Sequence, residues 1–268
     1  TPTTINKDRF CGINILFDVS FENSPQSKIT KIPDHLFYSC LIRTLSLSED
    51  ITTIGFASFC KCEIEEIKFH PKSKLIEIGN KLIIYPPGKN ETTYIIPENI
   101  TSIDNCAFKG CSSLTSITLP NSVTSIGNDA FSGCSSLKSI ILHENVISIG
   151  EGAFDGNSKL ESITVSSNNS HFKSIDGVLF NKDGSKLIFY PPGKNETTYI
   201  IPENITSIDN CAFKGCSSLT SITLPNSVTS IGNSAFSECK SLKSITLSNS
   251  ITDRNLIVCW NLNVCGKN

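Results

Sequence analysis

Four histidines are the first residues to test for catalysis, because an imidazole can act as general acid, general base or metal ligand near neutral pH. His35, His70, His143 and His171 lie far apart in the sequence. Their spacing allows no Ser-His-Asp triad and no paired-carboxylate arrangement to be argued. We therefore predict that the chain is not an enzyme, and that it has no catalytic residue, no cofactor and no metal site.

Twelve cysteines could serve metal binding, redox chemistry or packing. Cys60-Lys-Cys62 is the closest pair and could be a metal or redox site. The sequence has no C-x-x-C motif with partner ligands, which a zinc site normally requires. A structural role is therefore favoured for these two cysteines.

Four other cysteines occupy the same position in successive units of a repeat: Cys111, Cys134, Cys216 and Cys239. In one unit this position is held by Asn157 instead. A free cysteine behaves as a small buried hydrophobe, so we interpret this set as a column of reduced, buried thiols. The alternative is disulfide bonding, because Cys106 lies close to Cys111 in the sequence and Cys211 lies close to Cys216.

The repeat that positions these cysteines is clearest between Ile205 and Leu247. Cys216-Ser-Ser-Leu219-Thr-Ser-Ile222-Thr-Leu224 returns 23 residues later as Cys239-Lys-Ser-Leu242-Lys-Ser-Ile245-Thr-Leu247. A fixed period of this length with apolar residues at L-x-x-I-x-L is typical of a leucine-rich-repeat solenoid. One unit cannot bury its apolar residues alone, but stacked units can.

Each unit predicts its own local structure. Leu114, Ile117 and Leu119 alternate with polar residues, which indicates a short strand with one buried face. The turn signal Pro120-Asn121-Ser122 ends that strand, and residues 123–126 form a second extended segment. Residues 129–134 are too few for a full helix and are expected to form one helical turn with inward Ala, Phe and Cys.

The predicted fold is therefore an α/β, β-dominated, right-handed and horseshoe-like leucine-rich-repeat solenoid with short helical turns and β-hairpin inserts. We expect about ten coils at the strand spacing of about 4.8 Å, and hence a length of roughly 45–50 Å. The coils are marked by one phenylalanine each: Phe37, Phe59, Phe108, Phe131, Phe154, Phe213 and Phe236.

A second, longer period is also present. Residues 85–128 recur unchanged as residues 190–233, an offset of 105. Such a duplication weighs against a catalytic site, which would not normally occur twice. Upstream of the second copy, Asn181-Lys-Asp-Gly184 between two apolar runs predicts a hairpin.

We expect one solenoid over residues 1–268. It begins with an N-terminal cap (1–28), repeats (29–69) and an insert (70–94). Further repeats (95–165), a hairpin insert (166–199) and a last set of repeats (200–250) follow. The chain ends in a C-terminal cap or tail (251–268).

Composition excludes some partners. The net charge of −2 gives no reason to expect nucleic acid. No apolar run approaches the roughly 20 residues that a membrane span needs, so no membrane insertion is expected from this chain. The chain has no Met and no signal peptide, so we expect a processed or trimmed form of a longer product.

The unit I-T-L-P-x-S-V-T-S-I-G-x-x-A-F-x-x-C-x-S-L resembles the BspA-like, or Treponema-type, class of leucine-rich repeats. Residues 29–69, 95–165 and 200–251 carry this resemblance, about three fifths of the chain. The resemblance implies a protein of a bacterial or parasite surface that adheres to host cells or extracellular-matrix proteins. It implies no shared catalytic residues.

The predicted binding surface is the concave sheet, whose outward strand residues would meet a partner. The alternative is a solvated, hydroxyl-covered sheet without a ligand. The residues assigned to this face are Glu66, Lys68, His70, Ser116, Thr118, Ser139, Ile141, His143, Ser162, Thr164, Ser221, Thr223, Ser244 and Thr246.

Five Asn-x-Ser/Thr sequons would accept glycans if the chain were secreted by a eukaryote: Asn90, Asn99, Asn168, Asn195 and Asn204. They favour a cell-surface or secreted protein that binds a host or matrix protein. Free buried cysteines favour the alternative, a cytoplasmic leucine-rich-repeat scaffold or signalling protein.

Overall fold

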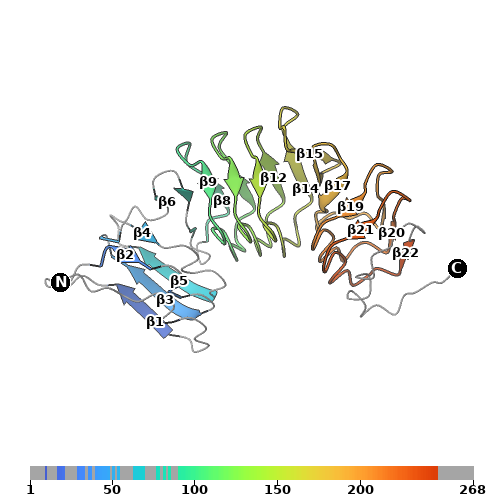
Figure 1. Cartoon of the computed structure of the whole chain (residues 1–268). Helices are drawn as coiled ribbons and strands as arrows, with labels where there is room; N and C mark the ends of the chain where they lie inside the picture. Colours follow the sequence, from blue (N-terminus) through green and yellow to red (C-terminus); the bar gives the residue numbers. More distant parts are fainter. Residues whose placement is uncertain are drawn as a thin grey trace.

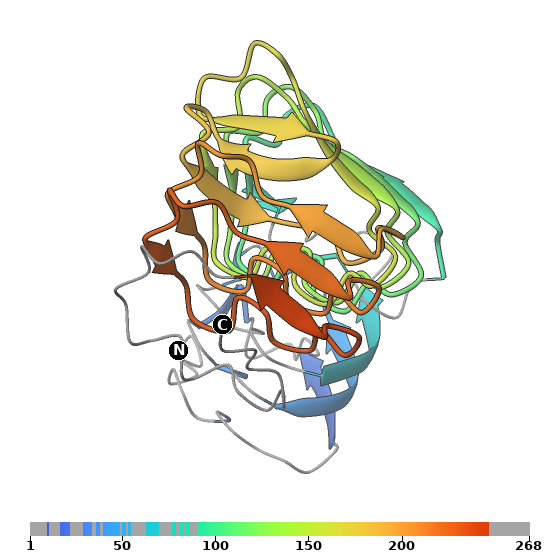
Figure 2. The ribbon, with the colours of Figure 1, turned by 90° about the vertical axis from the view of Figure 1, so that its right-hand side faces the viewer.

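The computed structural model describes most of the chain from residue 90 onward and parts of the segment before it. The described residues are 10, 17–21, 29–33, 36–37, 40–48, 50–51, 53–54, 63–69, 77–78, 81–82, 84–85 and 90–246. Within them the regular secondary structure consists of β-strands alone. The coils form a β-solenoid of about 8 turns, fewer than the ten expected. They follow one another along an arc (Figure 1) and overlay one another when seen from the end (Figure 2).

A regular coil contains two short strands joined by a turn. β10 (Ser116–Thr118) buries Ile117 and exposes its two neighbours, as the alternation predicts. The Val123 N–H bonds to the Pro120 carbonyl (3.2 Å) and closes the turn that ends this strand. β11 (Ser125–Ile126) follows and buries Ile126.

The first strands of successive coils pair in parallel and form one side of the solenoid. Besides β10 they are β8 (Thr93–Ile95), β12 (Ser139–Leu142), β14 (Ser162–Val165), β18 (Thr198–Ile200), β20 (Ser221–Thr223) and β22 (Ser244–Thr246).

The second strands form another side. Besides β11 they are β7 (Lys81–Leu82), β9 (Ser102–Ile103), β13 (Ser148–Ile149), β19 (Ser207–Ile208) and β21 (Ser230–Ile231). β6 (Glu77–Ile78) pairs antiparallel with β7.

Nearer the N-terminus, two further parallel sheets are described. One contains β1 (Phe17–Phe21), β3 (Leu41–Leu47) and β5 (Glu63–Phe69), and the other contains β2 (Lys31–Ile32) and β4 (Thr53–Ile54). Within the N-terminal cap expected at residues 1–28, the structure describes only residue 10 and β1.

The expected helical turns are wrong for the part of the chain that the structure describes. In residues 129–134, the N–H groups of Asp129, Phe131 and Gly133 bond to carbonyls of the next coil, 2.8–2.9 Å away. Asp129 and Gly133 also have positive φ values of 54° and 75°, which a right-handed helix cannot contain. The N–H groups of Ala130 and Ser132 bond to carbonyls three residues earlier. The segment therefore forms successive turns that are held to the next coil, and it does not form a helix.

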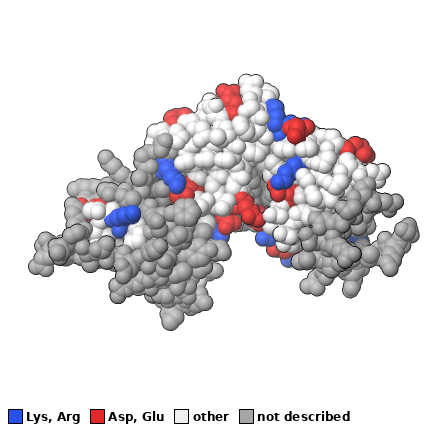
Figure 3. Space-filling model, viewed as in Figure 1, with Lys and Arg blue, Asp and Glu red and all other residues white. Residues whose placement is uncertain are grey.

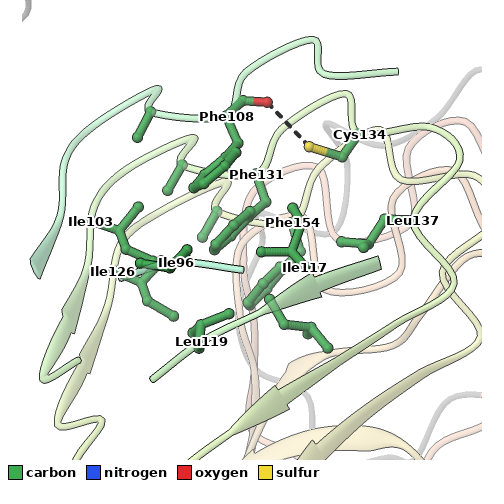
Figure 4. Close-up of a cluster of buried hydrophobic side chains, with 14 of the residues drawn as sticks. Ile96, Ile103, Phe108, Ile117, Leu119, Ile126, Phe131, Cys134, Leu137 and Phe154 are labelled. Carbon is green, nitrogen blue, oxygen red and sulfur yellow. Dashed lines mark hydrogen bonds between the residues drawn. The ribbon is translucent and has the colours of Figure 1, made fainter. Parts of the chain in front are cut away.

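The core is a stack of aromatic rings flanked by aliphatic side chains and thiols (Figure 4). The ring of Phe131 stacks between Phe108 (5.1 Å between centroids) and Phe154 (5.9 Å). Beside the rings, the Cys134 thiol bonds to the Phe108 carbonyl at 3.1 Å. The four cysteines of the repeat column are all buried, Cys106 and Cys211 are half-buried, and none of the six forms a disulfide. Their burial is as the column interpretation expects.

The hairpin insert interrupts the regular coils. β16 (Val178–Asn181) and β17 (Lys186–Phe189) pair antiparallel around residues 182–185, as the N-K-D-G signal predicts. The sequence did not reveal β15 (Phe172–Ile175), which pairs antiparallel with β16. β17 then pairs in parallel with β19 and returns the chain to the solenoid. The segment from β15 to β17, drawn in yellow, extends beyond the neighbouring coils in both views (Figures 1 and 2).

Several predictions fall outside the described residues. They concern most of the N-terminal cap, Cys60 and Cys62, Phe59, and the C-terminal segment 251–268.

Candidate binding surface

The outward side chains of the first strands line up across coils into a surface that we call the strand face. It comprises the exposed or half-buried alternate residues of β8, β10, β12 and β14, and of β18, β20 and β22. In the first set, Thr118 lies beside Ile95, and Ile141 lies beside Thr164. β10 and β12 are also neighbours. The result is a continuous row of isoleucine and threonine next to a row of hydroxyls.

The strand face exposes large apolar side chains to solvent. Ile95 is 73% exposed and Ile141 is 53% exposed, and both lie on strands of the first set. In the second set Ile200 is 72% exposed, beside Thr223 and Thr246. Isolated surface isoleucines are ordinary, but Ile95 and Ile141 lie in one row with Thr118 between them and offer a partner apolar contact area.

Most predicted residues of this face lie where the sequence places them. Ser116, Thr118, Ser139, Ile141, Thr164, Thr223, Ser244 and Thr246 are exposed, and Ser162 and Ser221 are half-buried. The Ser244 hydroxyl lies 3.0 Å from the Ser221 hydroxyl in the adjacent strand.

The remaining predicted residues differ. The His143 ring is half-buried, and its Nε2 lies 2.8 Å from the Leu119 carbonyl, so this side chain bonds to the neighbouring coil. Glu66 and Lys68 lie on β5 opposite Thr44 and Ser46, but their side chains are outside the described set. His70 is also outside it.

The sequence analysis missed four residues of the strand face: Thr93 and Ile95 on β8, and Thr198 and Ile200 on β18. Both strands were assigned largely to inserts or to their edges. A signal was present, because Tyr94-Ile95-Ile96-Pro97 has the same pattern as Ile117-Thr118-Leu119-Pro120. The apolar outward residue obscured the alternation on which the assignment depended.

Threonine hydroxyls just before a strand bond to the preceding coil on both sides of the solenoid. Thr115 and Thr220, before β10 and β20, donate to the Thr92 and Thr197 carbonyls at 2.9 Å. The hydroxyls of Thr124 and Thr229, next to the second strands, donate to the Thr101 and Thr206 carbonyls of the preceding coil at 3.1 and 3.2 Å. In the part of the chain that the structure describes, the hydroxyls of Thr118, Thr164 and Thr223 make no such bond. They remain able to bond to a partner.

Some of the charged residues form ion pairs. Lys109 lies 3.3 Å from Asp129, and Lys186 lies 2.8 Å from Asp209, in each case joining neighbouring coils. On the face shown in Figure 3, opposite charges lie close together and leave broad uncharged areas between them. Within the described ranges, no group of His, Cys, Asp and Glu side chains could hold a metal ion.

Two buried tyrosines are structural. Burial, together with the nearby Glu196, raises the pKa of Tyr190 far above its usual value. Burial and the hydrogen bond to Glu91 act in the same direction on the pKa of Tyr85. Both phenols therefore stay protonated, and each ring stacks on the phenylalanine of the next coil, Phe108 or Phe213.

All five sequon asparagines have exposed side chains: Asn90, Asn99, Asn168, Asn195 and Asn204. Asn168 and Asn204 use the amide nitrogen that would carry a glycan in hydrogen bonds. Asn168 Nδ2 bonds to Glu144 at 3.3 Å, and Asn204 Nδ2 bonds to the Gly184 carbonyl. No described element is a helix that could cross a bilayer.

Comparison with known proteins agrees with this geometry. The profile of the BspA type leucine rich repeat region matches six copies, over residues 1–84, 88–192 and 185–258. A search of curated protein sequences finds no significant match.

Two crystal structures have a similar fold. One is the pneumococcal vaccine antigen PcpA, with a TM-score of 0.63 and 23% identity over 90% of this chain and 62% of the antigen chain. The other is a leucine rich cell surface protein from Faecalibacterium prausnitzii, with a TM-score of 0.60 and 26% identity over 90% of this chain and 71% of that one. The chain thus spans less than two thirds of the PcpA structure.

Proposed function

We propose that this chain, which belongs to the BspA-type leucine-rich repeat family, is a non-enzymatic binding module of a cell surface. In this proposal, a microbe or parasite uses it to adhere to a host cell-surface or extracellular-matrix protein. A similar protein described as a leucine rich cell surface protein supports the location. The strand face is the part of the module that would contact the partner.

One observation carries the assignment of the strand face. Its exposed threonines within the strands, Thr118, Thr164 and Thr223, make no side-chain hydrogen bond in the described structure. Exposed Ile95 and Ile141 lie in the same row as the free hydroxyls. A partner would find both apolar area and hydrogen-bonding groups there.

Binding by this face should depend on several coils at once. Each coil offers one or two small side chains, and these bury little area compared with the roughly 800 Å² per partner of a stable interface. Several coils, or several molecules on one cell, would have to act together.

The test compares charge substitutions on the two sides. Thr118→Lys, Ile141→Lys and Thr164→Lys together should abolish attachment of the purified chain to cultured epithelial cells and to surfaces coated with matrix extract. The matched variant carries Thr124→Lys and Ser148→Lys on the other side and should bind as the parent does. Surface substitutions of this kind usually change stability by less than about 0.5 kcal/mol, which thermal unfolding would check. Loss of attachment in the second variant alone would refute the strand face as the binding surface.

The buried free thiols favour a second candidate function, an intracellular scaffold or signalling protein. Free thiols persist most readily in reducing compartments. Fractionation of the producing cell decides between the two candidates, because surface labelling and attached glycans at the sequons would exclude the scaffold.

A further inference from the structure

The regular coils are joined by a hydrogen-bond ladder along their turns. Cys106, Phe108 and Gly110 donate their N–H groups to the carbonyls of Asn128, Ala130 and Ser132 in the next coil, at 2.7–2.9 Å. The same pattern joins residues 129–133 to 151–155, and residues 211–215 to 233–237.

The ladder is broken where the hairpin insert enters the solenoid. In the described structure the N–H groups of Gly152 and Phe154 donate to no carbonyl, although their counterparts in other coils do. On the opposite wall, the Asn210 carbonyl accepts no N–H, whereas the equivalent Asn128 carbonyl accepts one. Two facing walls therefore present unpaired backbone groups.

The cause is a shortened turn. In regular coils the stacked ring lies five positions after the last residue of the second strand, as Phe131 does after Ile126. In the insert, Leu187 pairs with Ile208 and only three residues later Tyr190 takes the ring position. In the insert, Phe189 contacts the Phe154 ring and Tyr190 stacks on the Phe213 ring, but the insert lacks the part of the turn that would pair with both walls.

The omitted backbone leaves a cavity of about 280 Å³, which we call the notch. Ile149, Phe154, Ile188 and Phe189 provide its apolar surface. Its polar surface comes from residues 150–152, Asp155, Asp209 and Asn210. The notch therefore combines apolar contact with unpaired backbone donors and an acceptor.

The rim of the notch is acidic after its ion pairs are counted. Asp155 pairs with Lys214 at 3.2 Å, and Asp209 pairs with Lys186 at 2.8 Å. Glu151 has a neutral partner, the Asn210 amide, at 3.2 Å. A cation would bind this carboxylate more strongly than the amide does, because charge-assisted hydrogen bonds are stronger than neutral ones.

We propose that the notch binds a short extended segment of a partner protein that carries a lysine or arginine between small residues. Gly152 and Phe154 are two residues apart, so carbonyls of an extended segment can accept from both N–H groups. The segment's own N–H would donate to the Asn210 carbonyl, and its cation would displace the Asn210 amide from Glu151. This is strand addition, in which backbone bonds supply affinity and one side chain supplies selectivity.

The test uses the whole chain, labelled with ¹⁵N, and the blocked peptide acetyl-Ala-Lys-Ala-amide at millimolar concentration. The amide signals of Gly152 and Phe154 should shift and their hydrogen exchange should slow. Acetyl-Ala-Glu-Ala-amide should shift them at least tenfold less at the same concentration. Equal shifts with both peptides, or no shift with the lysine peptide, would overturn the proposal.

Two variants separate charge recognition from damage to the fold. Glu151→Gln keeps the side-chain shape and should weaken binding of the lysine peptide about tenfold. Glu203→Gln removes an exposed carboxylate away from the notch and should leave binding unchanged. If the Gly152 and Phe154 signals instead move on dilution without peptide, the occupant is a second copy of the chain and the partner proposal is wrong.

Discussion

Replacing Asn157 by cysteine should stabilise the protein, which is unusual for a change in a core. Asn157 is 0% exposed, and neither its Oδ1 nor its Nδ2 makes a hydrogen bond within the described structure. In other coils a cysteine holds this position and donates to the carbonyl of the preceding ring residue. Cys134 does so to Phe108 at 3.1 Å, and Cys239 does so to Phe213 at 3.0 Å.

The magnitude follows from the unpaired amide. A buried polar group without a partner costs about 1–3 kcal/mol. Asn157→Cys removes that cost and adds a thiol that can reach the Phe131 carbonyl, so we expect a gain of about 1–3 kcal/mol. At roughly 2–4 °C per kcal/mol for a chain of this size, the melting temperature should rise by about 2–12 °C.

Urea unfolding followed by circular dichroism measures this gain, with the midpoint rising and the slope unchanged. Asn157→Asp is the matched control and should destabilise, because it buries a charge of nearly the same shape. Amide exchange should slow most in residues 130–160, since coils couple to their nearest neighbours. A fall in the midpoint for Asn157→Cys would refute the reasoning and show that the amide has a partner.

Three further predictions concern packing. Phe131→Ala should cost about 3–5 kcal/mol, because the fully buried ring leaves a cavity between Phe108 and Phe154; a loss below about 1 kcal/mol in urea unfolding would contradict this. Gly150→Ala should cost about 1–3 kcal/mol, since its Cβ would lie 2.3 Å from the Asn128 nitrogen; a melting temperature equal to the parent's would contradict it. The thiols of Cys111, Cys134, Cys216 and Cys239 should react with a maleimide only after unfolding, because they are buried. In addition, hydrogen bonding to Cys134 and burial raise the pKa of Cys111. Mass spectrometry of the native chain checks this prediction.

Much of the fold could be predicted because the same alternation of apolar and polar residues recurs in every repeat unit. The alternation around Ile117 identifies the buried and exposed sides of a strand, and the structure has them as expected. The hairpin around residues 182–185 was predicted from its turn residues and the apolar runs on either side of them. Burial of the cysteine column could also be predicted, since a position shared by all coils must be buried in all of them.

The turns could not be predicted, because their conformation depends on another coil. Asp129-Ala-Phe131 is compatible with a helical turn when it is considered alone. The N–H groups of Asp129 and Phe131 instead bond to the carbonyls of Glu151 and Ala153, more than 20 residues away. Non-local hydrogen bonds of this kind leave no local pattern in the sequence.

Thus the sequence by itself determined the solenoid, the inward residues and the approximate strand face, since these follow from period and alternation within one unit. Only the tertiary structure decided which hydroxyls remain available, because the partner of Thr124 is a carbonyl of the preceding coil. It also decided that Asn157 has no partner and that a turn shortened by two residues leaves a notch between Gly152 and Asn210. The physical reason is the same in each case: a hydrogen bond between coils is satisfied or left open by the neighbouring coil, and the residue alone does not reveal which.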